Sequence, residues 1–270
     1  MTCYDIFRKC FPQFELTEEV FNRLSNINNI HLITHEEKGE LCGFALVEKM
    51  ALRLICVSPE YQNNGIGTTL LKKAENYIKQ NGGNEILTGG ASSQLLIGTP
   101  DNAVAFFKKD GFKIVGSCDE MTIDIHSFNS ENIDLSVPNE CHFDWFEGDF
   151  EKLRDAVFKV EKEWVQYFSP DSKIFCAFYG DEIASFCLVE YDSICILSTD
   201  TNKVGVIGCV GTIPEFRRKG IGLKMVALAT DDLRKNGCDS CFIHYTGVAN
   251  WYAKLGYETF LKLHFMKKDI

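Results

Sequence analysis

The sequence predicts an α+β fold built from two similar domains with mixed sheets, and two repeated stretches carry this prediction. The stretch "PEYQNNGIG" (59–67) recurs as "PEFRRKGIG" (214–222), at a constant offset of 155 residues. The stretch "AFFKKDGF" (105–112) recurs as "NWYAKLGY" (250–257), at an offset of 145. Two separated segments that repeat in the same order indicate that a whole folding unit is duplicated.

The elements around these stretches are expected in the same order in both copies. Segments 51–57 and 203–213 predict buried strands, because they are short runs rich in Ile, Val and Leu. After each glycine loop, apolar residues at helical spacing predict a helix that ends at a glycine, over 68–82 and over 223–237. The residues expected on the buried faces of these two helices are Leu70, Leu71, Ala74, Tyr77 and Ile78 in the first copy and Val226, Ala229 and Leu233 in the second. A short strand (85–89 and 240–246), a short helix and closing strands follow in each copy, while strand pairs and amphipathic helices precede each loop.

The repeat also predicts where the domains meet. We expect an N-terminal domain over 1–125 and a C-terminal domain over 141–270, joined by a polar linker over 126–140 that contains a proline. The first copy has ten more residues between its two matching segments than the second has. We place these extra residues in a predicted long loop, 89–102, which is rich in small and polar residues.

The composition limits the classes of function. The chain has 270 residues, 45% of them hydrophobic, and a formal net charge of −10. This charge argues against a protein that mainly binds nucleic acid or an anionic membrane. The first residues do not resemble a signal peptide, and no apolar run is long enough to cross a bilayer. Twelve cysteines in a long chain with ample apolar residues are typical of a reduced, cytoplasmic protein.

One cysteine pair, Cys238 and Cys241, has the CxxC spacing of many metal sites. No second CxxC and no paired histidines accompany it to complete four ligands. We therefore expect buried thiols at the start of a strand, and no metal.

The glycine loops predict an anion site. A strand that ends in a glycine-rich turn opening a helix presents backbone N–H groups and the positive end of the helix dipole. Neither loop is a P-loop, since GxxxxGK[ST] is absent. Neither is a dinucleotide fingerprint, since the third glycine of GxGxxG is missing.

The residues that carry a family resemblance are the loops "SPEYQNNGIG" and "IPEFRRKGIG" and the helix "WYAKLGY". A [Gln/Arg]-x-x-Gly-x-Gly loop followed later by such a helix resembles the acetyl-CoA loop and the short helix of the GNAT superfamily of N-acetyltransferases. Both halves share the resemblance, so the chain resembles a tandem GNAT protein. The resemblance implies two GNAT domains, each a mixed, mostly antiparallel sheet flanked by helices.

The resemblance also implies where acetyl-CoA binds. The loop amides would hold the diphosphate, and the splayed strand before the loop would hold the pantetheine arm and the thioester carbonyl. In the second copy these positions are Cys209, Val210, Gly211, Thr212, Arg217, Arg218, Lys219, Gly220, Ile221 and Gly222. A second possible cofactor site in the first copy comprises Ile55, Val57, Gln62, Asn63, Asn64, Gly65, Ile66 and Gly67.

Two differences between the copies favour a catalytic C-terminal domain and a degenerate or supporting N-terminal one. In the family a tyrosine of the short helix often protonates the leaving thiolate, and Tyr252 stands at this position where the first copy has Phe107. The second loop has two arginines and a lysine, whereas the first has neutral amides. One position departs from the family pattern, since Tyr245 replaces the Asn that often precedes the catalytic Tyr by seven residues.

The general base is left open by the sequence. The strand before the second loop has no carboxylate, so the candidates are His244, Glu190 and Asp192. A relay through water, without a dedicated base, is the alternative for an amine of low pKa.

The acceptor is expected to be a small-molecule amine, with an amino sugar (glucosamine or a glucosaminide) as the first hypothesis. The two-copy layout resembles bacterial tandem GNAT proteins, which include such enzymes. Aromatic residues that suit a sugar ring are Trp164, Tyr167, Tyr245 and Trp251. The alternatives are an antibiotic, a thiol precursor, a peptide, or an acyl-CoA sensor that catalyses nothing. We expect a monomer, since the two domains are able to pair with each other.

Overall fold

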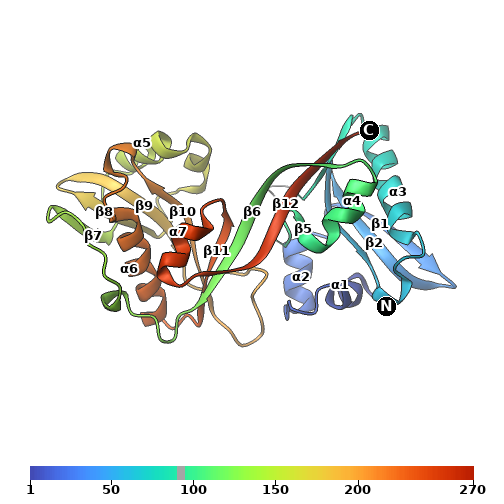
Figure 1. Ribbon diagram of the computed structural model, residues 1–270, viewed down its shortest axis with the longest axis horizontal. Helices are drawn as coiled ribbons and strands as arrows, with labels where there is room; N and C mark the ends of the chain where they lie inside the picture. The colour runs from blue at the N-terminus through green and yellow to red at the C-terminus, as the bar shows by residue number, and fades with distance from the viewer. Residues whose placement is uncertain (90–94) are drawn as a thin grey trace. The chain divides into compact units, whose positions relative to one another are not determined.

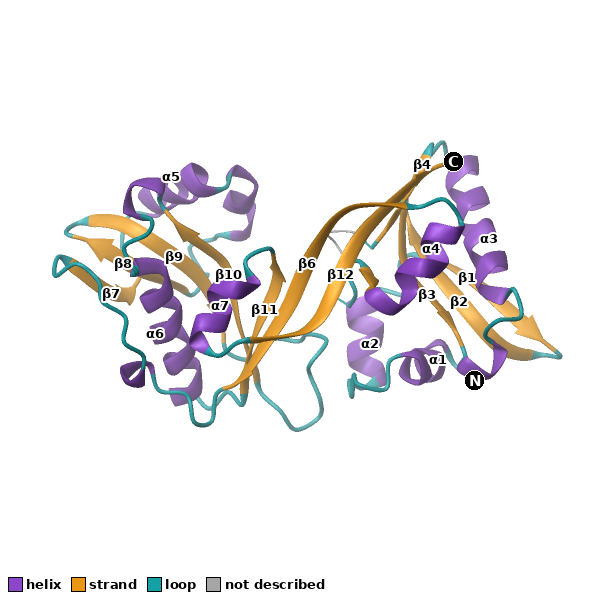
Figure 2. Ribbon diagram, viewed as in Figure 1, coloured by secondary structure: helices purple, strands orange, loops and turns teal. Residues whose placement is uncertain are grey.

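The computed structural model describes residues 1–89 and 95–270, which form two compact units. Unit 1 comprises Met1–Asp119, Ile194–Thr201 and Leu261–Ile270, and unit 2 comprises Glu120–Ser193 and Asn202–Phe260. Each unit is a mixed sheet with helices against it (Figures 1 and 2), so the expected α+β class is confirmed. Along the described chain, no helix combines the length and the apolar composition that crossing a bilayer requires.

Unit 1 is built around four consecutive strands and the end of a strand from the far end of the chain. Neighbouring strands pair antiparallel except β3 and β4, which run parallel. Its strands are β1 (His31–Glu37), β2 (Glu40–Glu48), β3 (Ala51–Val57), β4 (Glu85–Thr88), β5 (Thr99–Pro100) and the end of β12 (Glu258–Asp269). Its helices are α1 (Cys3–Cys10), α2 (Glu18–Ser25), α3 (Ile66–Gln80) and α4 (Val104–Lys109).

The helix α3 follows the first glycine loop and packs on one face of this sheet. Leu70, Leu71, Ala74 and Ile78 are buried, as the helical spacing predicted. Phe107 of α4 lies in the same apolar cluster. The other face is covered by α1 and α2, where Phe21 of α2 meets Phe44 of β2 edge to face, with the ring centroids 6.5 Å apart.

The end of β12 completes unit 1. Lys267 lies opposite Leu87 of β4 in antiparallel register, and the side chains of Leu263 and Met266 are fully buried. Lys268 Nζ donates to carboxylate oxygens of Glu75 and Asp110, at 2.6 Å each. The last ten residues of the chain therefore belong to the core of unit 1.

Unit 2 repeats the arrangement. Its strands β7 to β10 pair antiparallel in succession, and β10 pairs parallel with β11. Its strands are the end of β6 (Lys113–Asp124), β7 (Cys141–Trp145), β8 (Ile174–Tyr179), β9 (Glu182–Glu190), β10 (Val204–Thr212) and β11 (Ser240–Thr246). Its helices are α5 (Phe150–Val160), α6 (Ile221–Lys235) and α7 (Ala249–Tyr252), with the 3-10 segment η4 (Lys162–Tyr167) after α5.

The two faces of the unit 2 sheet carry separate apolar clusters, because side chains alternate along each strand. One face packs on α6 and α7, through Val226, Cys241 and Ile243 among others. The opposite face packs on α5, through Val157 and Phe186 among others. Two different environments thus lie on either side of the strands that precede the second glycine loop.

Most predicted elements are confirmed. Strands over 51–57 and 240–246 and the helices after both glycine loops appear where the sequence predicted them. The predicted loop 89–102 contains the short strand β5, and its residues 90–94 lie outside the described residues. The expected boundaries at 125 and 141 remain a prediction about domains; the compact units change within β6, near residue 119, and unit 1 takes up the chain's end.

His126, just after β6, lies within hydrogen-bond distance of two aspartates. The ring nitrogens of His126 lie 2.8 Å from Asp124 Oδ1 and 3.1 Å from Asp239 Oδ1. The pKa of His126 is raised, mainly by the hydrogen bond with Asp124. Stability from this raised pKa is fully present below the ordinary histidine pKa of about 6.5 and is lost as the pH rises through the folded-state value.

As the pH rises from 5.5 to 8, the unmodified protein should lose this part of its stability. We expect the loss to be smaller in His126→Gln. The measurement is urea unfolding of both proteins at the two pH values. An unchanged pH dependence in the variant would contradict the role given to this histidine.

Candidate active site

The strands β10 and β11 separate in the middle of unit 2. Their parallel pairing covers Val204 to Val206 against Ser240 to Phe242 and stops there. Both strands continue, to Thr212 and Thr246 respectively. The separation leaves backbone groups of β10 facing a gap, where an extended ligand is able to hydrogen-bond to the strand as a partner strand would. The predicted splay of the strand before the loop is therefore present.

A β-bulge lies on β10 at the same place. Gly208 pairs with Leu188 and Gly211 pairs with Phe186, so β10 has one residue more than β9 between these pairs. Cys209, within the bulge, has a φ of +48°. Bulges of this kind redirect backbone groups beside active sites. Burial raises the pKa of the Cys209 thiol to about 11, so at neutral pH this thiol is protonated and not a nucleophile.

The helix α6 begins without the usual stabilisation of its first turn. Its N-cap is Gly220, in the left-handed conformation with no side-chain cap, and no acidic residue lies in its first turn. The helix α3 in unit 1 has the same features at Gly65. By contrast, α5 is capped by the side chain of Asp149 and has an acidic first turn. A long helix with open N–H groups and no nearby carboxylate is suited to an anion.

The second loop glycine allows close packing. A Cβ added at Gly222 would lie 2.5 Å from Thr212 Oγ1 and 3.6 Å from the Trp251 ring. In unit 1, a Cβ at Gly67 would lie 3.3 Å from the ring of Phe106, the counterpart of Trp251. The glycine therefore brings the helix start, the strand end and the short helix together in both units.

The three basic residues of the second loop are placed differently. Arg217 Nε donates to the Thr212 carbonyl at 2.9 Å and braces the loop. Lys219 Nζ lies 5.4 Å from the ring centres of both Tyr179 and Phe216. Arg218 is exposed, has a φ of +64° and lines the cavity beside α6. Of the three, Arg218 is the one placed to meet a bound anion with its charge.

The cavity has a volume of about 640 Å³. It brings together the splayed strand, the glycine loop and the short helix. Its lining includes Val210, Thr212, Arg217, Arg218, Gly220, Gly222, Trp251 and Tyr252. Tyr252 is 5% exposed, and burial raises its pKa above the ordinary phenol value. Its hydroxyl therefore carries its proton at neutral pH, as a proton donor requires.

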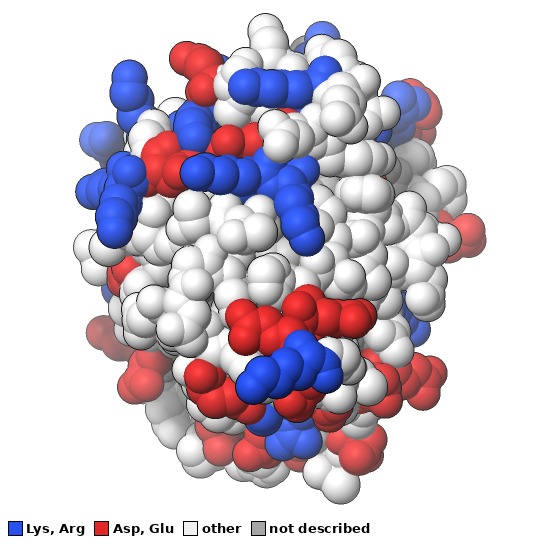
Figure 3. Space-filling model, turned by 90° about the vertical axis from the view of Figure 1, so that its right-hand side faces the viewer, with Lys and Arg blue, Asp and Glu red and all other residues white. Residues whose placement is uncertain are grey.

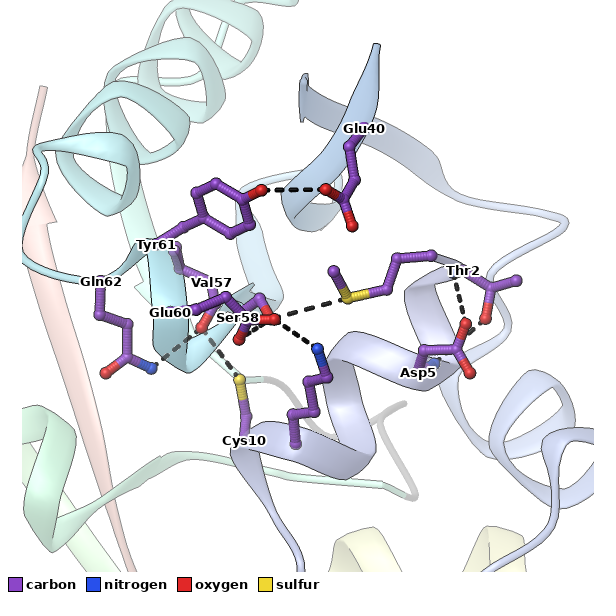
Figure 4. A network of polar contacts seen from close by, with 11 residues as sticks. Thr2, Asp5, Cys10, Glu40, Val57, Ser58, Glu60, Tyr61 and Gln62 are labelled. Carbon is purple, nitrogen blue, oxygen red and sulfur yellow. Dashed lines mark hydrogen bonds and ion pairs between the residues drawn. The ribbon is translucent and has the colours of Figure 1, made fainter. Parts of the chain in front are cut away.

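The corresponding region of unit 1 is braced by its own first helix (Figure 4). The Val57 carbonyl accepts hydrogen bonds from Gln62 Nε2 at 2.9 Å and from Cys10 Sγ at 3.2 Å. Glu60 forms an ion pair with Lys9 of α1 and accepts a hydrogen bond from Ser58. The Gln62 contact matches the Arg217 contact of unit 2, so this loop position has a structural role in both copies.

Two of the three base candidates lie far from the loop. Glu190 is exposed, accepts a hydrogen bond from Ser193, and pairs across from Val206. Six residues separate Val206 from Thr212, a rise of roughly 20 Å along an extended strand. Asp192 is exposed and lies just beyond the end of β9. The geometry does not bring these carboxylates to the cavity.

The third candidate lies on the separated part of β11. His244 is two residues beyond Phe242, the last residue paired with β10. Its Nδ1 lies 2.8 Å from Glu120 Oε2, and its side chain is 39% exposed while that of Glu120 is 3% exposed. Sequence reasoning missed Glu120. The sequence offered no clear signal for it, since Glu120 is one of three carboxylates within a few residues of a predicted strand.

The remaining predicted residues are placed as follows. Cys238 and Cys241 are buried, with Cys241 near the start of β11 and Cys238 two residues before the strand begins. Within the described residues, no cluster of three or more His, Cys, Asp or Glu side chains is placed to hold a metal. Of the four aromatics considered for a sugar ring, Trp251 lines the cavity, Tyr167 and Tyr245 are exposed, and Trp164 packs against the α5 cluster.

Two family models match the sequence. Residues 5–122 match the acetyltransferase (GNAT) domain, and residues 139–257 match the acetyltransferase (GNAT) family. The chain therefore belongs to the GNAT superfamily as a tandem acetyltransferase, and the family takes its acetyl group from acetyl-CoA. No curated protein matches the sequence significantly.

Solved structures share the fold over both units. A glucosamine N-acetyltransferase region of a fungal multi-domain GH3 β-N-acetylglucosaminidase is 20% identical, with a TM-score of 0.77 over 98% of this chain and 36% of that one. This chain thus spans about a third of that protein. A GCN5-related N-acetyltransferase from Sphaerobacter thermophilus is 16% identical, with a TM-score of 0.73 over 98% of this chain and 90% of that one. A tandem GNAT protein from the clavulanic acid pathway is 13% identical, with a TM-score of 0.61 over 98% and 95%.

Proposed function

We propose that unit 2 transfers an acetyl group from acetyl-CoA directly to a primary amine, with an amino sugar as the acceptor. The observation that supports this most is the cavity that joins the splayed strand β10, the uncapped start of α6 and Tyr252. Unit 1 is then a supporting domain. It has Phe107 in place of the tyrosine and neutral amides in its loop.

The residues present fit acetyl-CoA as the donor. The first-turn N–H groups of α6 and the guanidinium of Arg218 suit a diphosphate. Beyond Val206 the backbone of β10 is not paired with β11, and there it suits the amides of the pantetheine arm and the thioester oxygen. When bound, acetyl-CoA supplies an activated acetyl thioester.

His244 and Tyr252 transfer protons in the proposed reaction. His244 accepts a proton from the acceptor's ammonium group, which makes the nitrogen nucleophilic, and passes the proton to solvent. Tyr252 donates its hydroxyl proton to the departing sulfur and regains one from solvent. The acylated nitrogen also gives up one proton, so one proton is released for each acetyl group transferred. Tyr252 lies in the apolar cluster that packs on α6, and the alternation of side chains along β11 puts His244 on the opposite face of the sheet.

The amino sugar is the most specific part of the proposal. It is supported by the similarity in fold to the glucosamine N-acetyltransferase region, which covers 98% of this chain. Trp251 also lines the cavity, and aromatic rings of this kind stack on sugars. On the side of unit 1 that Figure 3 shows, Lys and Arg lie among Asp and Glu with uncharged surface between them.

The experiment is an assay of CoA release with acetyl-CoA and a panel of amines: glucosamine, its short β-linked oligomers, polyamines, an aminoglycoside and a lysine peptide. Turnover of glucosamine or its oligomers supports the proposal. Turnover of polyamines or peptides alone would exclude the amino sugar and retain the acetyltransferase. Binding of CoA without turnover of any amine would favour an acyl-CoA sensor.

The different positions of the basic residues in the second glycine loop predict different effects on acetyl-CoA binding. Arg218→Ala should weaken acetyl-CoA binding by about 10-fold or more, since a charge-assisted hydrogen bond contributes about 1.5–3 kcal/mol. Lys219→Ala, the matched control, should change the dissociation constant little, since Lys219 packs on Tyr179 and Phe216. Isothermal titration calorimetry with acetyl-CoA measures both. A larger loss in the Lys219 variant would show that the loop binds the donor in another way.

A further inference from the structure

We propose that Glu120 is a positioning residue that fixes His244 as the general base of unit 2. Nothing in the family matches assigns a role to either side chain. The inference rests on the proposed acetyl transfer for its catalytic meaning, and on the geometry of this pair for its structural part.

The pair joins two strands that are far apart in the sequence. Glu120 lies on β6 and His244 on β11, 124 positions later, with Glu120 Oε2 2.8 Å from His244 Nδ1. The strands are neighbours in unit 2, and Thr122 Oγ1 donates to the Cys241 carbonyl close by. The other carboxylate oxygen, Glu120 Oε1, is buried and has no hydrogen-bond partner among the described residues. Burying a carboxylate is costly unless a partner compensates it, and the imidazole is that partner.

The hydrogen bond determines which ring nitrogen is free. A carboxylate accepts a hydrogen bond, so His244 Nδ1 carries the proton in the neutral ring. His244 Nε2 then has a lone pair and is able to accept a proton, as a general base requires. When Nε2 accepts that proton, the negative charge of Glu120 stabilises the imidazolium.

The pleat of the sheet directs the pair to the acceptor's side. Cys241 and Ile243 face α6 and Tyr252, so Phe242 and His244 face the other way. Met121 and Ile123 of β6 also face α6, which places Glu120 on the same side as His244. A donor held against α6 and an acceptor entering from the α5 side would meet in the gap between β10 and β11.

Other titratable side chains lie on β11 and on its neighbour β10. On its other side, β11 neighbours β10, which has Cys209 as its one titratable side chain between Val204 and Thr212. The pKa of this thiol is raised to about 11 by burial, so it stays neutral. Tyr245 follows His244 on the same strand and is 60% exposed. Glu120 is therefore the charged group in hydrogen-bond contact with the imidazole.

Unit 1 lacks this pair. The register of β3 with β4 places Leu87 beside Ala51 as Phe242 lies beside Val206. The counterpart of His244 is then Gly89, which has no side chain. The unit without the tyrosine thus also lacks the base.

The first test measures the tautomer and needs neither donor nor acceptor. In ¹⁵N-labelled protein at pH 8, two-bond ¹H–¹⁵N spectra report which ring nitrogen of each histidine is protonated, and His244→Gln assigns the His244 signals by their loss. We expect the Nδ1–H tautomer in the unmodified protein, and a larger share of the Nε2–H tautomer in Glu120→Gln. The Nε2–H tautomer in the unmodified protein would overturn the proposal.

The second test measures turnover with the best acceptor. Glu120→Gln should lower kcat/KM by about 10-fold or more, because the imidazole loses the contact that fixes its tautomer and orientation. Acetyl-CoA affinity should stay unchanged. Glu120→Asp, which keeps the charge, should recover part of the activity.

The matched control is Asp101→Asn, the same change beside His264 in unit 1, where Asp101 Oδ1 lies 2.6 Å from His264 Nε2. It should leave kcat/KM unchanged. A Glu120→Gln variant that is folded, binds acetyl-CoA and keeps the rate would overturn the positioning role. If no amine is turned over at all, the proposed function fails. The tautomer measurement then still tests whether Glu120 fixes the protonated nitrogen of His244.

Discussion

Replacing Tyr252 by Phe should lower kcat by about 100-fold or more while acetyl-CoA still binds. A positioned general acid contributes about 10²–10⁴ to the rate, and Phe keeps the ring. The ring of Tyr252 packs edge to face on Trp251, at a centroid distance of 4.8 Å, and on Tyr257 at 5.9 Å. The substitution therefore removes the proton donor and retains the packing. Steady-state kinetics and calorimetry with acetyl-CoA separate the two effects.

The matched control is Phe107→Tyr in unit 1. Phe107 stands at the equivalent position, is 4% exposed and packs on Phe112. If unit 2 carries out the reaction, adding a hydroxyl here changes neither kcat nor KM, although burial of the hydroxyl will lower stability. Full activity of the Tyr252 variant would show that the leaving sulfur needs no acid from this helix, or that the reaction takes place in unit 1.

Local sequence patterns predicted the elements well. For α3 and α6, three local signals predict the same helix: the apolar spacing, the glycine before the first turn and the glycine after the last turn. The predicted bounds of α3 differ from the observed ones by two residues at each end. The strands β3 and β11 have the predicted bounds, because their β-branched, aromatic and other apolar residues favour a strand.

Contacts between distant residues were not predictable in this way. The hydrogen bond between Glu120 and His244 depends on which strands become neighbours, and a single sequence gives no register for β6 and β11. The three basic residues of the second loop look alike in sequence. Their separate roles depend on backbone angles, above all the φ of +64° at Arg218. Asn63, at the same place in unit 1, has a φ of +63° and tolerates it better.

The positive φ of Arg218 also bears on function. A non-glycine residue other than Asn or Asp in this region costs about 1–2 kcal/mol, and such strain gathers at functional sites. In unit 1 the amide at this position avoids most of that cost. The unit that retains an arginine there is also the one with Tyr252 and His244, so three separate differences favour unit 2 as the catalytic one.

The path of the last strand leads to the second large expected effect. Deleting residues 261–270 should unfold unit 1, although these residues lie at the end of the expected C-terminal domain. The buried side chains of Leu263 and Met266 would be lost, and large-to-small changes at such sites cost about 2–5 kcal/mol each. The contacts of Lys268 with Glu75 and Asp110 would go too. These losses are comparable with the whole stability of a domain, about 5–15 kcal/mol.

The chain offers a separate probe for each unit. All three tryptophans, Trp145, Trp164 and Trp251, belong to unit 2, so their fluorescence reports on that unit. The buried thiols of Cys42 and Cys56 report on unit 1 through their rate of reaction with a thiol reagent, located by peptide mapping. After the deletion we expect these thiols to react rapidly while the tryptophan emission stays native. Met266→Ala should give a milder form of the same pattern, and Lys262→Ala, on an exposed position of the same strand, should give none. Slow thiol reaction with altered tryptophan emission would mean that the last strand stabilises unit 2. That outcome would agree with the C-terminal domain over 141–270 that the sequence predicts.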